Sequence, residues 1–398
     1  MKPAARCSGA ILAILFAGLS AAQTQSVETA WQWLAQGKRD EAVTLLRGLI
    51  QADPRNANAR LLLGSILVEA GQRSESVAQL REAVRLLPQS AEAHNALGEA
   101  YNVFGDPAAA RPEFERAVSL DPRHAQAQAN LGDVLVQQNE LTLAAPHLDQ
   151  AIQLLGRSPD AAYPHYQRAK VYTDANDAAK AASDLQQAVE LRPDFAEAWS
   201  DLGAASKMLA DDAGALAAFR RAVALKPEDA VAQYRLGAQL LEGGSAHAAV
   251  EPLEAAVRLD PGNQSALNAL QRALRQDGQT GRAEAVKARL AELLRQRDQA
   301  DQKMVAAFEL NNRGTELEKA GDLPGALEKY RAALALLPEH AGIRANLGVA
   351  LLKAGQWKEG IAQLRQALDR DPSISRLRHA LDDAVAQAKA HGIPLDQP

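Results

Sequence analysis

A proline that returns at a nearly constant interval constrains this chain more than any other feature. Most intervals are 34 residues, and two longer intervals of 71 and 77 residues each hold two units plus a short insertion. A period of this length is typical of solenoids, in which each unit buries its apolar face against its neighbours. The repeating prolines are Pro54, Pro88, Pro122, Pro193, Pro227, Pro261, Pro338 and Pro372.

The period divides the chain into ten units. They begin at residues 23, 57, 91, 125, 162, 196, 230, 264, 307 and 341. We expect units one to eight over residues 23–297, units nine and ten within 298–372, and a capping helix with a tail over 373–398. Between Arg282 and Lys319 there is no proline and only one glycine, Gly314. This absence of helix breakers predicts one extended helix between the two blocks.

Each unit has the pattern of a helical hairpin. Apolar residues at spacings of three and four mark two amphipathic helices. The eighth place is Gly or Ala in nine of the ten units, as in Gly98 and Gly203, and the twentieth place is always small. The twenty-fourth place is large in nine units, as in Phe114. Small residues therefore lie where the two helices cross, and large residues fill the gaps beside them.

Proline also occurs inside three of the second helices, at Pro112, Pro146 and Pro252. A proline in a helix interior removes a backbone hydrogen bond and costs about 3 kcal/mol. We therefore expect either kinks at these units or second helices that start late.

These features closely resemble the tetratricopeptide repeat family, from residue 23 to about residue 372. The first unit and the eighth unit, which has Gln271 at the small eighth place, match least well. The resemblance implies an all-α fold: a right-handed superhelical solenoid of about ten helix-turn-helix units with a C-terminal capping helix. It also implies a concave groove lined by the first helix of each unit.

The N-terminus has the pattern of a secretory signal peptide over residues 1–22. Lys2 and Arg6 precede a nine-residue apolar run, Ile11–Leu19, and small residues follow, so cleavage is expected before Gln23. The mature protein would then be periplasmic or secreted. The alternative is an uncleaved N-terminal anchor. The only cysteine, Cys7, lies in this leader, so the mature chain would have no disulfide.

Charge and motifs argue against several classes of protein. The net charge is −5, which disfavours nucleic acid and anionic membrane surfaces as partners. No phosphate-binding loop, dinucleotide fingerprint, zinc-protease motif or nucleophile elbow occurs. No two of the eight histidines lie within four residues, and we interpret His94 and His165 as interhelix packing residues rather than metal ligands. We therefore expect no metal, no cofactor and no catalytic residue.

In the family, groove-facing residues occupy the second, fifth, sixth, ninth, twelfth and thirteenth places of a unit. Tyrosines gather there in mid-chain, and these either anchor a ligand or pack between helices. Acids come first (Glu69, Glu92, Glu99, Asp133) and bases follow (Lys207, Arg272, Arg275, Lys319, Lys353), either as a gradient that orients a ligand or as unrelated surface charge. The candidate protein-binding residues are Asn95, Glu99, Asn130, Asp133, Tyr163, Tyr166, Lys170, Lys207, Tyr234 and Arg235.

The leader, the repeats and the absence of catalytic motifs together predict an exported, non-enzymatic scaffold. It would bind a peptide or a partner protein in the groove. An accessory subunit of a cell-envelope polymer-export or assembly complex is the alternative, and an enzyme without a recognisable motif is a third possibility. The sequence leaves the partner's identity and the oligomeric state open.

Overall fold

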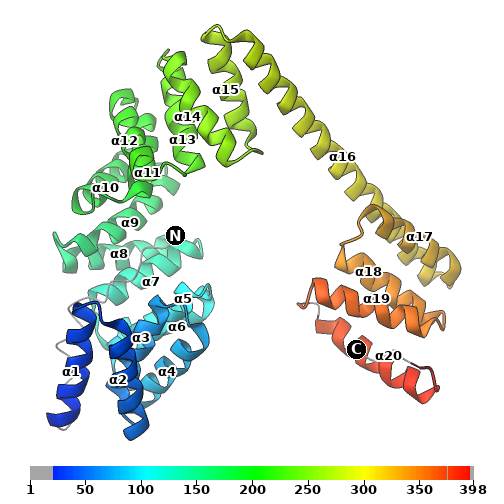
Figure 1. Ribbon diagram of the computed structural model, residues 1–398, viewed down its shortest axis with the longest axis horizontal. Helices are drawn as coiled ribbons and strands as arrows, with labels where there is room; N and C mark the ends of the chain where they lie inside the picture. Colours follow the sequence, from blue (N-terminus) through cyan, green and yellow to red (C-terminus); the bar gives the residue numbers. More distant parts are fainter. Residues whose placement is uncertain (1–20, 374, 395–398) are drawn as a thin grey trace. The chain divides into compact units, whose positions relative to one another are not determined.

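The computed structural model describes residues 21–373 and 375–394, and these residues form helices and no strand (Figure 1). The all-α solenoid class expected from the repeat is confirmed. The leader residues 1–20 lie outside the described residues. The helices are α1 (Ala21–Ala35), α2 (Arg39–Ala52), α3 (Ala57–Glu69), α4 (Arg73–Leu86), α5 (Ala91–Val103), α6 (Pro107–Leu120), α7 (Ala125–Gln137), α8 (Leu141–Leu155), the short 3-10 helix η2 (Pro159–Ala161), α9 (Ala162–Asp174), α10 (Ala178–Leu191), α11 (Ala196–Met208), α12 (Asp212–Leu225), α13 (Ala230–Glu242), α14 (Ala246–Leu259), α15 (Gln264–Gln276), α16 (Thr280–Lys319), α17 (Leu323–Leu336), α18 (Ala341–Lys353), α19 (Trp357–Arg370) and α20 (Ser375–Ala390).

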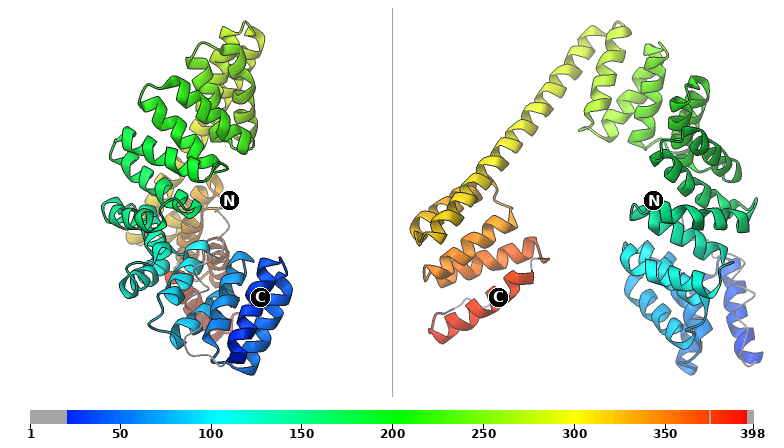
Figure 2. Two further views of the ribbon diagram at one scale, coloured as in Figure 1. Left: turned by 90° about the vertical axis from the view of Figure 1, so that its left-hand side faces the viewer. Right: turned by 180° about the vertical axis from the view of Figure 1, so that it is seen from behind.

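The chain forms two compact units, one ending at Gln279 and the other beginning at Thr280. Within each unit the hairpins stack in chain order, as Figure 2 shows. First helices start at the first residue of the 34-residue frame in units two to eight and in unit ten. The division falls earlier than the boundary after residue 297 that the repeat count suggested, because the second helix of unit eight is the beginning of α16.

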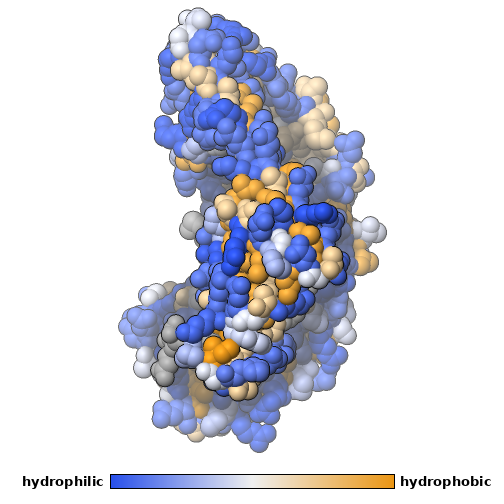
Figure 3. Space-filling model, turned by 90° about the vertical axis from the view of Figure 1, so that its right-hand side faces the viewer, coloured by the Kyte–Doolittle hydropathy of each residue, from blue (hydrophilic) through white to orange (hydrophobic). Residues whose placement is uncertain are grey.

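Helix α16 is continuous over 40 residues, so the predicted extended helix is confirmed. No residue between Thr280 and Gly314 interrupts the backbone ladder, and the last part of α16 serves as the first helix of unit nine, packed on α17. Most of its middle section is exposed, including the large apolar side chains Leu294, Met304 and Val305. On the face of the molecule drawn in Figure 3, hydrophobic residues gather in patches between hydrophilic ones.

The small eighth place is explained by direct contact with the large twenty-fourth place. A Cβ atom added to Gly98 would lie 2.7 Å from the ring of Phe114, and one added to Gly203 would lie 2.5 Å from the ring of Phe219. Both rings are buried. The two helices of a hairpin can therefore approach only where one of them lacks a bulky side chain.

The fourth place of the first helix has a role that the sequence analysis missed. Its polar side chain bonds the carbonyl oxygen of the repeat-terminal proline six residues earlier. Gln128 Nε2 donates to the Pro122 oxygen at 2.9 Å, and Gln233 Nε2 does the same to Pro227 at 2.9 Å. His94 lies at this place, with Nε2 3.3 Å from the Pro88 oxygen and Nδ1 2.6 Å from Glu113. These bonds fix the turn between consecutive units.

The three internal prolines do not delay their helices. Helices α6, α8 and α14 start at Pro107, Leu141 and Ala246 and run through the proline without a break, so the expected late start is wrong. The residue four positions before each proline, whose carbonyl loses its helical partner, is exposed in all three helices, and water can replace the lost donor. These residues are Ala108, Thr142 and Ala248.

Candidate ligand-binding cavity

A cavity of about 560 Å³ lies in the compact unit that ends at Gln279. It is bounded by the first helices of three consecutive repeats, α9, α11 and α13, and by the second helix α10. Its volume is within the range of ligand cavities, about 300–1,000 Å³. The lining residues are Tyr166, Ala169, Lys170, Thr173, Asp174, Ala178, Ala181, Leu185, Asp201, Ala204, Ala205, Met208 and Arg235.

The cavity lies where α11 carries a small residue at a place that is charged in the three preceding units. The ninth place of units three, four and five is Glu99, Asp133 and Lys170, but in unit six it is Ala204. Ala205 and the buried Leu185 extend an apolar floor next to it. Met208 stands at the edge of this floor with 54% of its surface exposed. The cavity therefore offers apolar contact area next to the exposed side chain of Met208.

Polar side chains form one rim of the cavity. Tyr166 donates its hydroxyl to Asp201 Oδ2 at 3.2 Å, and Arg235 Nη1 donates to Asp201 Oδ1 at 2.8 Å. Burial, followed by the nearby charge of Asp201, raises the pKa of Tyr166, so its hydroxyl stays protonated as a donor. Arg235 also bonds Ser200 Oγ at 2.8 Å. These contacts hold α9, α11 and α13 in register with one another.

Of the charged residues that line the cavity, Asp174 and Lys170 are both exposed. Lys170 also contacts an aromatic ring. Its ammonium lies 4.5 Å from the centroid of the Tyr166 ring, a cation–π contact, and its side chain is exposed. It forms no ion pair with any residue in the described part of the chain. A ligand in the cavity would therefore meet the positive charge of Lys170 and the negative charge of Asp174 beside an apolar floor.

The tyrosines of unit five pack between helices as well as lining the surface. Tyr166 and Phe195 have ring centroids 4.8 Å apart, and Tyr163 lies 6.5 Å from the same Phe195 ring. The packing interpretation thus holds for Tyr163, whereas Tyr166 both packs and lines the cavity. Phe195 was missed because it precedes α11 and lies outside the places counted as groove-facing. Tyr234 is half-buried and does not line the cavity.

Asp133 is the centre of a buried hydrogen-bond network and is not an exposed binding residue. It is only 6% exposed and accepts hydrogen bonds from Tyr163 at 3.0 Å, from Gln137 at 2.8 Å, from Asn102 at 3.2 Å and from Gln167. Burial is the largest cause that raises its pKa, although these donors oppose it. This network connects α5, α7 and α9 by hydrogen bonds.

Other predicted binding residues also bond one another across neighbouring first helices. Asn130 Nδ2 donates to Asn95 Oδ1 at 3.0 Å, and Asn95 is buried. Lys207 is exposed and pairs with Glu242 at 2.5 Å. Of the predicted residues, the structure brings together Tyr166, Lys170 and Arg235 at the cavity, and it places the others on contacts outside it. Glu99 is half-buried and forms no hydrogen bond or ion pair with a described residue.

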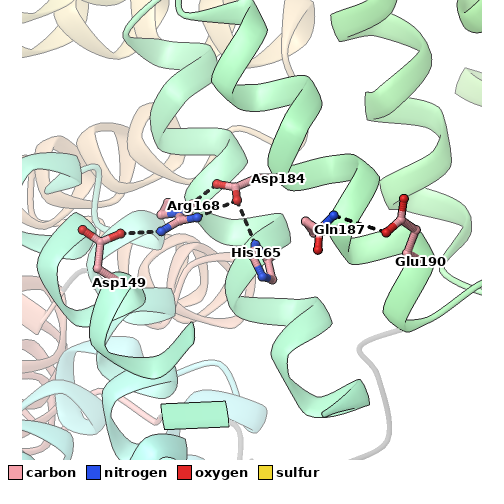
Figure 4. Close-up of polar contacts among 6 residues, drawn as sticks. All are labelled: Asp149, His165, Arg168, Asp184, Gln187 and Glu190. Carbon is pink, nitrogen blue, oxygen red and sulfur yellow. Dashed lines mark hydrogen bonds and ion pairs between the residues drawn. The ribbon is translucent and has the colours of Figure 1, made fainter. Parts of the chain in front are cut away.

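A second polar network lies next to the cavity and orients α10 (Figure 4). Arg168 binds Asp184 through two nitrogens at 2.7 and 2.8 Å and binds Asp149 at 2.6 Å, while His165 donates to Asp184 at 2.8 Å. Burial alone would raise the pKa of Asp184, but the hydrogen bonds from Arg168 and His165 outweigh burial and lower it. The adjoining residue Leu185 is thereby held at the cavity floor. His165 is an interhelix residue of this network.

Metal-binding clusters and membrane spans are both absent from the part of the chain that the structure describes. No group of three or more His, Cys, Asp or Glu side chains is arranged to hold a metal ion there. No described helix is both long and apolar enough to cross a membrane.

Comparison with known families identifies the class of protein. Models of the tetratricopeptide repeat match residues 34–100 in one version and residues 103–162, 166–206, 211–264 and 311–373 in another. These segments cover more than half of the chain. The chain therefore belongs to the tetratricopeptide repeat family.

Similarity to individual proteins is lower. The BBSome complex member bbs-4 of Caenorhabditis elegans is 30% identical over 80 residues, which cover 20% of this chain and 17% of that protein. The structure of pilF from Pseudomonas aeruginosa matches with a TM-score of 0.50 at 20% identity, covering 54% of this chain and 98% of that one. PilW, described as a widely conserved type IV pilus biogenesis factor, matches with a TM-score of 0.48 at 18% identity, over 54% of this chain and 98% of that one. At 20% identity, the match to pilF shows a shared fold.

Proposed function

We propose that this protein is a non-enzymatic scaffold that binds a peptide or a segment of a partner protein, and that the cavity between α9, α10, α11 and α13 is the central contact. The tetratricopeptide repeat is a protein-interaction fold, which supports the general class. The observation that carries the specific proposal is an apolar floor bordered by Lys170 and the half-exposed Met208. Exposed apolar area rimmed by polar groups is characteristic of interaction sites.

The lining of the cavity defines what a bound segment would contain. A large apolar side chain would fill the space over Ala204, Ala205 and Leu185. A backbone carbonyl or a carboxylate of the ligand would accept a hydrogen bond from Lys170. Tyr166 and Arg235 are already engaged with Asp201, so they act as a preformed wall that needs little reorganisation on binding.

The experiment that tests this proposal is partner capture with paired variants. Native protein is crosslinked in intact cells, isolated, and its partners are quantified by mass spectrometry. Tyr166→Ala combined with Lys170→Ala removes the cavity rim, and we expect it to reduce partner recovery at least about tenfold, since two central contacts are lost. Unchanged recovery would contradict the cavity as the binding site.

The chain supplies a matched control in the same hairpin. Lys180 also lies over a tyrosine ring, that of Tyr172, at 5.4 Å, and neither residue lines the cavity. Tyr172→Ala combined with Lys180→Ala removes the same atoms at a different place. This control should keep partner recovery within about twofold of the unaltered protein.

We also propose that the scaffold acts outside the cytoplasm, in the periplasm or after secretion. The support is the pattern of residues 1–22, in which Lys2 and Arg6 precede the apolar run. The mass of the protein isolated from cells tests this: a chain that begins at Gln23 supports export, and a chain that retains residues 1–22 supports the anchor. Recovery only within a large envelope assembly would favour the accessory-subunit alternative.

A further inference from the structure

The middle of α16 exposes large apolar side chains to solvent. This helix belongs to the compact unit that begins at Thr280, and every residue from 294 to 305 is exposed. Leu294, Met304, Val305 and Phe308 are the large apolar residues exposed on this helix. Apolar side chains gathered among charged ones on a surface are characteristic of an interaction site.

Six residues of α16 share one face of the helix. They follow one another at alternating spacings of four and three residues, which keep side chains on a single face and are typical of helices that pack against another helix. We call this set the α16 stripe, and at a rise of about 1.5 Å per residue it is about 27 Å long. The α16 stripe consists of Leu290, Leu294, Arg297, Asp301, Met304 and Phe308. Leu290 is half-buried, and the other five residues are exposed.

The apolar residues of the α16 stripe match one another when two copies of the helix lie antiparallel. The stripe has the same order from either end, because two apolar residues, two charged residues and two apolar residues follow one another at symmetric spacings. In an antiparallel pair, Leu294 of each copy lies opposite Met304 of the other. Leu290 lies opposite Phe308 in the same way. Each contact occurs twice, as the two-fold symmetry of a homodimer requires.

The two charged residues at the centre of the α16 stripe supply charge complementarity. Within one chain, Arg297 Nε lies 4.0 Å from Asp301 Oδ2, and both side chains are exposed. In an antiparallel pair, Arg297 of each copy lies opposite Asp301 of the other, so two ion pairs form between the copies. A parallel pair would place Arg297 against Arg297 and Asp301 against Asp301, and these like charges repel.

The charges along the rest of α16 favour the same orientation. From Lys287 to Arg297 the helix has four basic residues and one acidic residue. From Asp298 to Glu309 it has three acidic residues and one basic residue. An antiparallel arrangement places the basic segment of each copy beside the acidic segment of the other, which favours association of two copies in this orientation.

We propose that the α16 stripe is the contact surface of a homodimer in which two copies of α16 pack antiparallel. A second copy fits this surface because it supplies both the apolar residues and the opposite charges at matching spacings. The contact is short compared with standard interfaces, so we expect a reversible dimer with a dissociation constant on the order of 10 μM. The inference goes beyond the proposed function, since a dimer would carry two cavities and could hold a partner with two suitable segments more tightly.

The test is sedimentation equilibrium of the protein isolated from cells, at concentrations from about 1 to 200 μM. Arg297→Asp places a carboxylate opposite Asp301 of the other copy, and Asp301→Arg places a guanidinium opposite Arg297. We expect each variant alone to weaken dimerisation at least about tenfold. An equimolar mixture of the two variants should restore the dimer, because opposite charges then meet again. A misfolded variant would not regain the dimer in this way.

Lys303→Asp is the matched control. It changes the charge of the same helix by the same amount, but Lys303 is exposed on the opposite face from the α16 stripe. This variant should keep the dissociation constant within about twofold of the unaltered protein, since its side chain does not lie between the two helices.

Disulfide formation tests the orientation of the two helices. Cys7 is the only cysteine of the chain, so single cysteines can be introduced in a Cys7→Ser background. A mixture of Leu294→Cys and Met304→Cys proteins should form a disulfide between positions 294 and 304 under mild oxidation, because these positions lie opposite each other. Leu294→Cys protein that instead forms disulfides with itself as readily would contradict the antiparallel arrangement.

Three results would overturn the inference. They are an unaltered protein that stays monomeric over the whole concentration range, a dimer that Arg297→Asp leaves unchanged, and a mixture of the two charge variants that does not regain the dimer. None of these results changes what partner capture by the Tyr166 and Lys170 variants shows. Failure of this inference can therefore be distinguished from failure of the proposed function.

Discussion

Gly203 is the position at which a single methyl group should reveal how tightly a hairpin is closed. A Cβ atom there would lie 2.5 Å from Cε1 and 2.6 Å from Cδ1 of Phe219, and that ring is only 2% exposed. The ring cannot move into solvent, so α11 and α12 must separate. Overpacking of this kind costs about 1–3 kcal/mol. We expect Gly203→Ala to lower the free energy of unfolding of this hairpin by that amount.

The neighbouring hairpin shows how the loss can be recovered. Unit five already has Ala169 at the eighth place, and its partner is Leu185 rather than a phenylalanine. Phe219→Leu alone should cost on the order of 1 kcal/mol, since it removes buried atoms. Combined with Gly203→Ala it should cost less than the sum of the two, by about 1 kcal/mol or more, because Ala169 and Leu185 of unit five already pack together as the same pair of residue types.

Hydrogen exchange of the α11 and α12 amides is the appropriate measurement, because repeat arrays can unfold in parts. The expected order of protection is unaltered protein, then the double variant or Phe219→Leu, then Gly203→Ala. A Gly203→Ala protein within about 0.5 kcal/mol of the unaltered one would refute the close-approach argument. So would strictly additive effects in the double variant.

Three further predictions concern charge and proline. The pKa of Glu99 is raised from 4.5 to about 7 in the folded state, so its carboxyl group destabilises the fold as the pH rises above 4.5. In urea unfolding, Glu99→Gln should therefore increase the free energy of unfolding by on the order of 2 kcal/mol at pH 8 and leave it unchanged at pH 4. Because the pKa of Asp184 is lowered below 3.8 in the folded state, its ionised carboxylate stabilises the fold above pH 3.8, and this stabilisation is lost as the pH falls below 3.8. Asp184→Asn leaves Arg168 without its buried partner. Thermal unfolding should show a cost of about 2–3 kcal/mol at pH 7 and a much smaller cost at pH 3. Pro112→Ala should restore a helical hydrogen bond, which should raise the free energy of unfolding by about 1–3 kcal/mol and raise Tm accordingly. Pro107→Ala, at the first turn of the same helix, should leave both unchanged.

The hairpins could be predicted because the same chemistry repeats in each unit. Gly98 facing Phe114 and Gly203 facing Phe219 express one packing requirement, and the period makes it visible in the sequence. The long helix α16 followed from the absence of any breaker before Gly314. For the internal prolines the sequence predicted either kinks or late starts. The structure excludes the late starts, and the kinks stay a prediction.

The candidate binding residues stay a prediction, and their grouping was less visible in the sequence than the hairpins, for a physical reason. Place numbers indicate which residues lie along the first helices, and three of the residues chosen in this way, Tyr166, Lys170 and Arg235, line the cavity. Place numbers do not show which residues bond one another. Asn95 and Asn130 satisfy each other across a spacing of 35 residues. The cavity itself depends on small residues, so its sequence signal is Ala204, at a place that is charged in the three preceding units.

The central claim, that a partner binds at the cavity, is tested most directly by site-specific photo-crosslinking in intact cells. A photoreactive residue replaces Met208, at the edge of the cavity, or Ala217, which is exposed on α12 and does not line it. The account predicts a discrete crosslinked partner from position 208 that is absent from position 217 and is lost when Tyr166 and Lys170 are changed to alanine. A partner captured equally from position 217, or captured from position 208 despite those changes, would contradict it.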